Sequence, residues 1–334
     1  MTERSTISQH RRPIPPVAGG EPRPRWSVMI PTYNCAHLLS ETLASVLAQD
    51  LGSQEMQIEV VDDCSTRDDP EAVVAELGQG RVGFHRQPRN VGHTANFDTC
   101  IERSRGHLVH LLHGDDVVRP GFYRRLERGL VEHPEVGAAF CRHILADEQG
   151  HWRVISRLEQ PAPGVLDGWL ERIAIGQLLQ PPAMVVRRSL YEHLGGFDRR
   201  IRQWSEDWEM WLRIAAHHPV WYEPEPLAVY RMRSGSLTSG AVSDGSATEE
   251  CCRIVSYAGE YLPAALHART APLAREECVV GGYRRLRRRL DAGDRHAVTW
   301  PQIRAALRCS RSARVLLHTG LLCGAALRAR AQAG

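Results

Sequence analysis

Two adjacent acidic residues, Asp115 and Asp116, stand in the stretch LVHLLHGDDVVRP, which covers residues 108–120. The positions before them are mostly apolar, so the two carboxylates come straight after a segment that favours burial. Two like charges repel each other, and burying either one without a partner is costly. A positively charged partner would remove both penalties. The pair therefore predicts a positive group at this position, and the alternative is a turn of solvated acids.

Polar residues also follow two other apolar runs. PTYN, residues 31–34, comes after WSVMI, and the acids Asp62 and Asp63 come after QIEVV. A further acidic pair, Glu206 and Asp207, lies near the start of the segment SEDWEMWLRIAA. A carboxylate can act there as a general base, but acids in the first turn of a helix also stabilise the helix through its dipole. The residue types alone leave both interpretations of Glu206 and Asp207 open.

The elements that must position these residues alternate between strand and helix. Strands are predicted at 26–31, 57–63, 81–87, 107–113 and near 137–143, and helices at 35–50, 70–78, 94–105, 121–134 and 205–216. This alternation predicts a largely parallel sheet with helices on both faces. Ligands bind such sheets beyond the carboxyl ends of the strands, so we expect the three polar clusters to converge on one edge.

The composition excludes several kinds of chemistry. The chain contains no lysine, so all 42 of its basic residues are arginine. Schiff-base enzymes, pyridoxal enzymes and Walker A phosphate loops need a lysine and are excluded. The net charge of +3 is too small to indicate nucleic acid as a partner. Nine scattered cysteines without C-x-x-C spacing fit neither a disulfide framework nor a zinc site, which predicts reduced thiols and a cytoplasmic location.

The two ends of the chain differ from its middle. Residues 1–24 are rich in Pro, Arg and Gly and are predicted to be a disordered lead, whereas residues 241–334 are predicted to be a helical region. The apolar stretch at 315–327 is too short to span a bilayer. The arginine run at 284–289 is typical of a solvated helical face. The alternative is peripheral contact of this region with the inner face of a membrane.

Four motifs make the chain resemble the family 2 glycosyltransferases of the GT-A fold. They are SVMIPTYNCAHLLSETLASVLAQ, EVVDDCSTRDDP, NVGHTANFDTCIERSRGHLVHLLHGDDVVRPG and SEDWEMWLRIA, and the resemblance runs from Trp26 to about Arg231. It implies an α/β fold with a Rossmann-like, mixed but mainly parallel sheet, flanking helices and a C-terminal helical region. The GT-A domain is expected at 25–240, with a nucleotide-sugar half at about 25–120 and an acceptor half at about 121–240.

The resemblance also implies a UDP- or dTDP-linked sugar donor. Thr32 and Tyr33 would lie against the base and the ribose, with the ring of Tyr33 as a stacking face. Asp63 would accept the N3 proton of uracil or thymine. The other residues expected to contact the donor are Pro31, Asn34, Asn90, Gly92, Asn96, His113, Asp115 and Arg233.

Metal binding and catalysis are likewise implied by the resemblance. Asp116 would bind Mg²⁺ or Mn²⁺, and Asp115 would join it or contact ribose and sugar hydroxyls. The spacing to Trp211 favours Asp207 over Glu206 as the base that takes the proton from an acceptor hydroxyl. Because the hydroxyl oxygen attacks the anomeric carbon directly, the configuration there is inverted. The metal would neutralise charge on the departing diphosphate.

The chain departs from the family pattern at two positions. Members commonly carry an acid two positions before the acidic pair, where this chain has His113. The metal would then be held more weakly, or His113 would face the sugar. Many members also carry a histidine where this chain has Arg233. Arginine cannot ligate a metal, but it can pair with phosphate oxygens.

These features predict an inverting glycosyltransferase that transfers a sugar to a hydroxyl of a glycan, a lipid-linked glycan or a small molecule. The expected setting is the assembly of cell-surface polysaccharide, glycolipid or a natural-product glycan. A non-catalytic nucleotide-binding or partner subunit is the alternative, and His113 is the feature that favours it. A nucleotidyltransferase is a third interpretation, which PTYNCAH disfavours because it lacks a glycine-rich phosphate loop. The residues indicate neither the sugar nor the oligomeric state.

Overall fold

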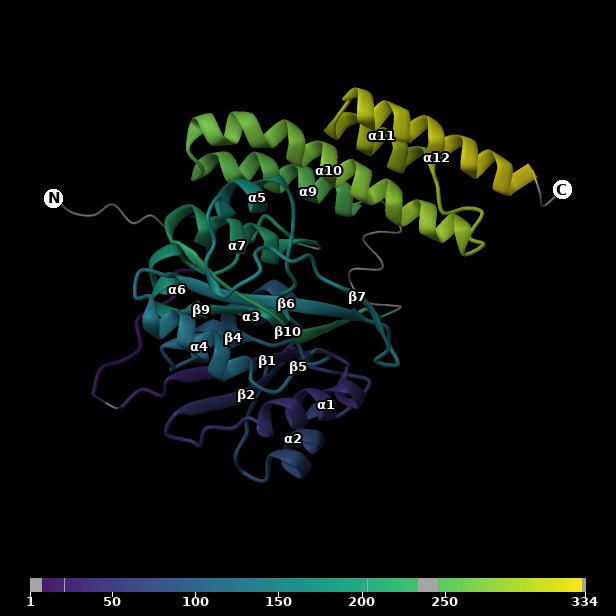
Figure 1. Ribbon diagram of the computed structural model, residues 1–334. Helices are drawn as coiled ribbons and strands as arrows, with labels where there is room; N and C mark the ends of the chain where they lie inside the picture. Colours follow the sequence, from purple (N-terminus) through teal and green to yellow (C-terminus); the bar gives the residue numbers. More distant parts are fainter. Residues whose placement is uncertain (1–7, 21, 203, 234–245, 332–334) are drawn as a thin grey trace. The chain divides into compact units, whose positions relative to one another are not determined.

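The structure is a computed structural model that describes residues 8–20, 22–202, 204–233 and 246–331 (Figure 1). Its elements follow one another as β1 (Trp26–Thr32), α1 (Ala36–Leu47), β2 (Met56–Asp62), α2 (Pro70–Gly78), β3 (Gly83–Arg86), α3 (His93–Arg103), β4 (Leu108–Leu111), β5 (Val117–Val118), α4 (Phe122–Glu132), β6 (Ala138–Ala146), β7 (Trp152–Ile155), β8 (Gly164–Val165), α5 (Trp169–Ile175), η1 (Pro181–Ala183), β9 (Met184–Arg187), α6 (Arg188–Leu194), α7 (Glu206–His217), β10 (Val220–Arg231), α9 (Ser246–Tyr257), η2 (Ala258–Glu260), α10 (Ala264–Asp291), α11 (Trp300–Cys309) and α12 (Ala313–Ala331). The alternation of strand and helix in the first 140 residues is confirmed. The predicted lead at 1–24 lies partly outside the described residues.

The chain divides into two compact units, which are described separately. Unit 1 comprises Met1–Asp167, Leu178–Arg200 and His217–Met232, and unit 2 comprises Gly168–Gln177, Ile201–Ala216 and Arg233–Gly334. Unit 1 contains the whole sheet, and unit 2 is helical. Unit 2 draws α5 and nearly all of α7 from within the segment 25–240, so the compact units interleave along the chain. The predicted domain boundaries stay a prediction.

The sheet of unit 1 is mixed, as predicted. Its strand order is β3-β2-β1-β4-β9-β6-β10-β5, with β7 paired to β6 and β8 to β10. β3, β2, β1 and β4 are parallel, and so are β6 and β10, while β9 runs antiparallel between β4 and β6. The consecutive parallel strands place the carboxyl ends of β1, β2 and β4 at the same edge.

Five strands are absent from the sequence prediction, namely the short β5, β7 and β8 together with β9 and β10. β10 contains Pro224 and Pro226, which cannot donate to a strand ladder and normally disfavour a strand in the middle of a sheet. The sheet accommodates these prolines by register shifts between Glu223 and Pro226 and between Pro226 and Ala228. The long apolar pairing of β10 with β6 therefore outweighs the local preference against a strand.

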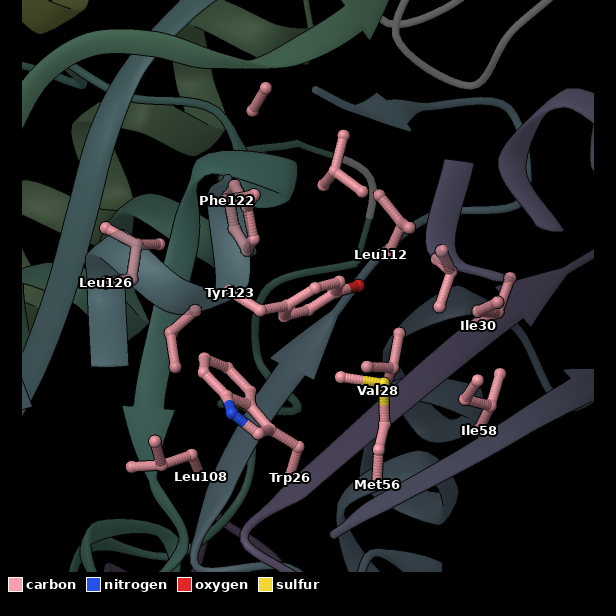
Figure 2. Close-up of a cluster of buried hydrophobic side chains, with 14 of the residues drawn as sticks. Trp26, Val28, Ile30, Met56, Ile58, Leu108, Leu112, Phe122, Tyr123 and Leu126 are labelled. Atoms are coloured by element: carbon pink, nitrogen blue, oxygen red, sulfur yellow. The ribbon is translucent and has the colours of Figure 1, made fainter. Parts of the chain in front are cut away.

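One face of the sheet carries the main hydrophobic core (Figure 2). Every second residue of β1 points to this face, namely Trp26, Val28 and Ile30, and all three are fully buried. α1, α2 and α4 cover them because their apolar residues recur at helical spacing. The rings of Trp26 and Tyr123 meet edge to face, with centroids 5.0 Å apart. Burying each large apolar side chain contributes about 1.5–3 kcal/mol, so this core holds the strand ends firmly in place. The opposite face of the same strands contacts α3.

Unit 2 has a hydrophobic core of its own. Apolar residues of α10, α11 and α12 form it, and the members with the least exposure are Val279, Val280 and Val315. α11 begins with a capping box in which Thr299 and Gln302 satisfy each other's backbone N–H groups. Across α9 and α11, Cys252 and Cys309 form a disulfide. The prediction that all nine cysteines stay reduced is wrong for this pair, because spacing along the chain does not show which cysteines the fold brings together.

Candidate active site

Three loops meet at the carboxyl edge of β1, β2 and β4, as predicted. The backbone N–H of Asp63 donates to the carbonyl of Thr32 at 2.9 Å, and the N–H of Gly114 donates to the carbonyl of Pro31 at 3.0 Å. A Cβ at Gly114 would lie 3.0 Å from the hydroxyl oxygen of Thr32, which is tighter than ordinary contact. Glycine therefore permits the acidic loop to lie directly against the end of β1.

The acidic loop brings together a group of possible metal ligands. His113, Asp115 and Asp116 each offer one ligand atom, and these atoms lie within 4.8 Å of one another. Asp116 is fully buried, whereas His113 and Asp115 are half-buried and face solvent in part. The donor set is two hard carboxylate oxygens and one imidazole nitrogen, which fits a divalent cation.

A distant segment holds Asp116 in position. The backbone N–H of Arg231, at the end of β10, donates to Oδ1 of Asp116 at 2.9 Å. The guanidinium of Arg231 is itself buried and pairs with Glu41 of α1 at 2.6 Å. This contact was absent from the sequence analysis, because nothing in local residue spacing signals a partner 115 positions away.

The imidazole of His113 is oriented by an aromatic neighbour. Its ring stacks on that of Phe97 in α3, with centroids 4.9 Å apart and planes 18° from parallel. Nδ1 of His113 lies 3.9 Å from Oδ2 of Asp116. His113 thus lies within reach of the two carboxylates, and both interpretations of it, a more weakly held metal or a contact with the sugar, stay predictions.

Asp63 links the end of β2 to the loop before α3. Its Oδ1 accepts from the N–H of Val91 at 2.7 Å, and its Oδ2 accepts from the N–H of Gly92 at 3.0 Å. Gly92 has φ of 87°, a left-handed conformation that glycine adopts without strain. The side chain of Asn90 donates to the carbonyl of Asp63. Burial raises the pKa of Asp63, although the two backbone N–H groups oppose this shift. Each carboxylate oxygen keeps a second lone pair with which to accept another hydrogen bond.

The remaining residues predicted to contact the donor differ in how accessible they are. Tyr33 is 44% exposed at the same edge and presents its ring to solvent. Asn34 has φ of 51° and is buried, and its Oδ1 accepts from the N–H groups of Thr66 and Arg67. Asn96 is also buried, and its amide bonds the carbonyl of Val61 and the side chain of Gln87. Asn34 and Asn96 thus hold loops and strands together, and their contact with a donor stays a prediction.

In unit 2, Asp207 lies in the first turn of α7 and is buried. Its Oδ2 accepts from Nε2 of Gln177 at 2.6 Å, and its Oδ1 accepts from the N–H of Trp208 at 2.8 Å. Burial, with the neighbouring charge of Glu206 as a second cause, raises the pKa of Asp207 well above the ordinary carboxyl range. A carboxylate whose pKa is raised by burial binds a proton more strongly than an ordinary carboxylate, and directed hydrogen bonds fix its orientation. Asp207 is therefore suited to accept a proton.

Gln177 is a hydrogen-bond partner of Asp207 that the sequence analysis missed. Its Oε1 accepts from the hydroxyl of Ser205 at 3.2 Å, which turns its NH₂ group toward Asp207. Gln177 follows α5 in an irregular segment and belongs to no motif, so no pattern signals its role. Glu206 is half-buried beside Asp207, and Arg233 lies two residues beyond the end of β10 in unit 2.

Comparison with known proteins assigns the family. The sequence model for glycosyl transferase family 2 matches residues 27–195, which is half of the chain. The chain belongs to glycosyl transferase family 2. This family 2 glycosyltransferase is 31% identical over 236 residues to an uncharacterized protein of Mycobacterium tuberculosis, a match that covers 65% of this chain and 70% of that protein.

Solved structures with the same fold agree with the assignment. Residues 1–349 of S. aureus TarS in complex with UDP-GlcNAc match with a TM-score of 0.65 at 18% identity, covering 90% of this chain and 87% of that chain. The mannosyltransferase PcManGT from Pyrobaculum calidifontis, in complex with GDP-Man and Mn²⁺, matches with a TM-score of 0.58 at 20% identity, covering 94% of this chain and 90% of that chain. The predicted GT-A fold is thereby confirmed for this family 2 glycosyltransferase.

Proposed function

We propose that this glycosyltransferase moves a sugar from a UDP- or dTDP-sugar to an acceptor hydroxyl, with inversion at the anomeric carbon and with Mg²⁺ or Mn²⁺ as cofactor. The observation that carries the proposal is the group of His113, Asp115 and Asp116 at the carboxyl edge of the sheet. The UDP-GlcNAc bound by TarS and the Mn²⁺ bound by PcManGT support the class of donor and of metal. PcManGT binds GDP-Man, so a guanosine-linked donor is the alternative to a pyrimidine-linked donor that the experiment must distinguish.

The metal proposal rests on the donor set. Asp116 and Asp115 would supply carboxylate oxygens, and His113 would supply an imidazole nitrogen in place of the acid that is common in the family. An imidazole ligand suits Mn²⁺ better than Mg²⁺, because Mg²⁺ is bound by oxygen almost alone. When bound, the cation neutralises negative charge on the diphosphate leaving group.

Nucleotide recognition is proposed for the loops after β1 and β2. The exposed ring of Tyr33 offers a face on which a base can stack, and Thr32 lies beside it. Asp63 is proposed to accept the N3 proton of a pyrimidine, using the lone pairs that its bonds to Val91 and Gly92 leave over. Pro31 and Asn34, together with Asn90, Gly92 and Asn96, shape this edge through their own hydrogen bonds.

Asp207 is proposed as the catalytic base, with Glu206 as the second candidate. Its carboxylate would accept the proton of the acceptor hydroxyl while the hydroxyl oxygen forms a bond to the anomeric carbon. The bond from that carbon to the diphosphate oxygen breaks with its electron pair, which leaves a nucleoside diphosphate. Gln177 orients the carboxylate and favours its ionised form by donating to Oδ2. Arg233 is proposed to pair with diphosphate oxygens.

The acceptor is proposed to be a hydroxyl of a glycan, a lipid-linked glycan or a small molecule. The cytoplasmic location, the absence of a nucleic-acid partner and the biosynthetic setting stay predictions from the sequence. Membrane contact is a separate question, because it depends on the surface of the C-terminal helices and not on this site.

Calorimetric titration of UDP, dTDP and GDP with and without Mn²⁺ tests the proposal. The informative variant is Asp116→Asn, which keeps Oδ1 as an acceptor for the N–H of Arg231 but removes the charge that would hold the cation. Glu132→Gln on α4 is the matched control, since it removes an exposed carboxylate that lies outside the four motifs. We expect metal-dependent binding of a pyrimidine diphosphate that Asp116→Asn loses and the control keeps.

Three other outcomes have clear meanings. Tighter binding of GDP than of UDP and dTDP would refute the pyrimidine assignment and the role of Asp63. Binding that is equal in Asp116→Asn would refute the metal site. Nucleotide binding by a protein that neither hydrolyses nor transfers any of a panel of UDP- and dTDP-sugars would favour the non-catalytic binding subunit.

A further inference from the structure

The last described helix, α12 (Ala313–Ala331), has an apolar surface on its exposed side. In unit 2, α12 packs along α10 and α11, where it is drawn in yellow in Figure 1. Its buried residues are Val315, Leu322, Ala325 and Ala326. On its solvent side, four leucines are more than half exposed, namely Leu316 at 53%, Leu317 at 63%, Leu321 at 56% and Leu327 at 66%. Within the described part of unit 2 they form the densest run of exposed large apolar side chains.

The four leucines lie on one continuous side of the helix. At about 100° per residue, they fall within an arc of about 140°, which we call the leucine face. The other residues of this arc are Ala313, Gly320, Gly324, Arg328 and Ala331. Arg328 is therefore the one charged residue of the leucine face among the described residues of α12. A soluble surface helix normally presents polar residues to water, so this inverted arrangement indicates a further partner for the face.

The segment that carries the leucine face has only positive side-chain charge, and acidic residues of neighbouring helices approach two of its arginines: Arg314 pairs with Glu276 and Glu277 of α10, and Arg308 lies 4.0 Å from Glu249 of α9. Residues 300–331 contain six arginines and no acidic residue. Three of these arginines, Arg304, Arg308 and Arg311, are exposed on α11 or just after it. A second copy of the chain would bring two such positive surfaces together, which repulsion disfavours. An apolar face bordered by cations fits a surface that is itself apolar beneath a layer of anions.

We propose that α12 lies in the interface of an anionic phospholipid bilayer, with the leucine face toward the acyl chains and the surrounding arginines against lipid phosphates. No helix among the described residues is long and apolar enough to cross a membrane, so the contact would be parallel to the surface. The proposal stands independently of the assigned nucleotide and catalytic residues, because α12 contains none of them.

Co-sedimentation of the full chain with vesicles tests this proposal. One set of vesicles contains phosphatidylglycerol and phosphatidylcholine in equal parts, and the other contains phosphatidylcholine alone. We expect binding to the anionic vesicles that weakens severalfold between low salt and about 0.5 M NaCl, because added salt screens the arginine–phosphate attraction. Leu317→Gln combined with Leu321→Gln should lower the vesicle partition coefficient roughly tenfold or more, since over half of each leucine surface is available for transfer from water.

Val131→Gln on α4 is the matched control. Val131 is 65% exposed, as the leucines are, but it lies in unit 1. The control should bind vesicles as the wild type does. Gln is nearly as good a helix former as Leu, and all substituted side chains point to solvent, so the variants are expected to fold. Circular dichroism checks this, and Leu316→Gln with Leu327→Gln is the second pair if the first does not fold.

The result that overturns the proposal is the absence of binding to anionic vesicles, or binding that both leucine pairs leave unchanged. Light scattering identifies the rival occupant. A wild-type dimer that the leucine pair converts to a monomer, without vesicle binding in either form, would assign the leucine face to self-association and refute the bilayer. Calorimetric titration of UDP into the same preparations separates this outcome from failure of the nucleotide site.

Discussion

Replacing Gln177 by Leu should move the pH dependence of the transfer reaction. In the wild type, Nε2 of Gln177 donates to Oδ2 of the buried Asp207 at 2.6 Å. This bond stabilises the ionised carboxylate, whereas burial opposes ionisation and raises the pKa of Asp207. Leu is similar in size to Gln but donates no hydrogen bond. The variant therefore removes the stabilisation of the charged form and leaves the burial in place.

The size of the effect follows from the kind of hydrogen bond. A hydrogen bond to a charged group contributes about 1.5–3 kcal/mol, and a tenfold change in a protonation equilibrium corresponds to about 1.4 kcal/mol. The acidic limb of kcat/KM should therefore move to higher pH by about one to two pH units in Gln177→Leu. At a pH well above the limb, Asp207 is ionised in both proteins, and the rate should recover toward the wild-type plateau.

The assay is release of nucleoside diphosphate from the donor sugar across a pH series, once a donor has been identified. Ser205→Ala is the matched variant, because the hydroxyl of Ser205 donates to Oε1 of Gln177 and acts on Asp207 only through the amide. Its limb should move in the same direction by less than that of Gln177→Leu. A lowered plateau with an unmoved limb would refute the reasoning, since it would show that Gln177 supports the fold and does not tune Asp207.

Three further predictions concern single residues. Asp207→Asn should abolish transfer, and it should raise the melting temperature at pH 8 but not at pH 4. The pKa of Asp207 is raised in the folded protein, so the stability that its protonated carboxyl contributes to the wild type is lost as pH rises above the ordinary carboxyl range. Equal melting shifts at both pH values would contradict this. Burial raises the pKa of Asp98, a buried residue of α3, to about 6. The stability that its protonated carboxyl contributes should therefore be complete below about pH 4 and lost as pH rises through about 6. Urea unfolding should therefore show Asp98→Asn to be more stable than the wild type at pH 8, by up to about 3 kcal/mol, and no more stable at pH 4. Tyr33→Ala should weaken binding of the nucleoside diphosphate by about 1–3 kcal/mol in calorimetry while Tyr33→Phe keeps it, and an equal loss in both variants would exclude stacking as the role of the ring.

Much of the fold and part of the site were predictable from local patterns. β1, β2 and β4 are short apolar runs that stop at polar residues, and the helices between them carry apolar residues at helical spacing. Local periodicity and the rule that ligands bind beyond parallel strand ends sufficed to predict that Thr32, Asp63 and Asp116 come to one edge. The side-chain roles of Asp116 and Asp207 came from the family resemblance, and they stay proposals that the experiments above test.

Tertiary structure decided the contacts that tune these residues. Gln177 reaches Asp207 from a segment 30 positions away, and Arg231 reaches Asp116 across 115 positions. Neither Gln177 nor Arg231 lies on a periodic face that would signal its partner, because such pairings depend on the path of the chain through the whole fold. The same holds for the two prolines that β10 accommodates in the middle of the sheet and for the disulfide between Cys252 and Cys309. Patterns a few residues long therefore determined where the polar loops begin, and long-range packing decided which side chains and backbone groups hold them in place.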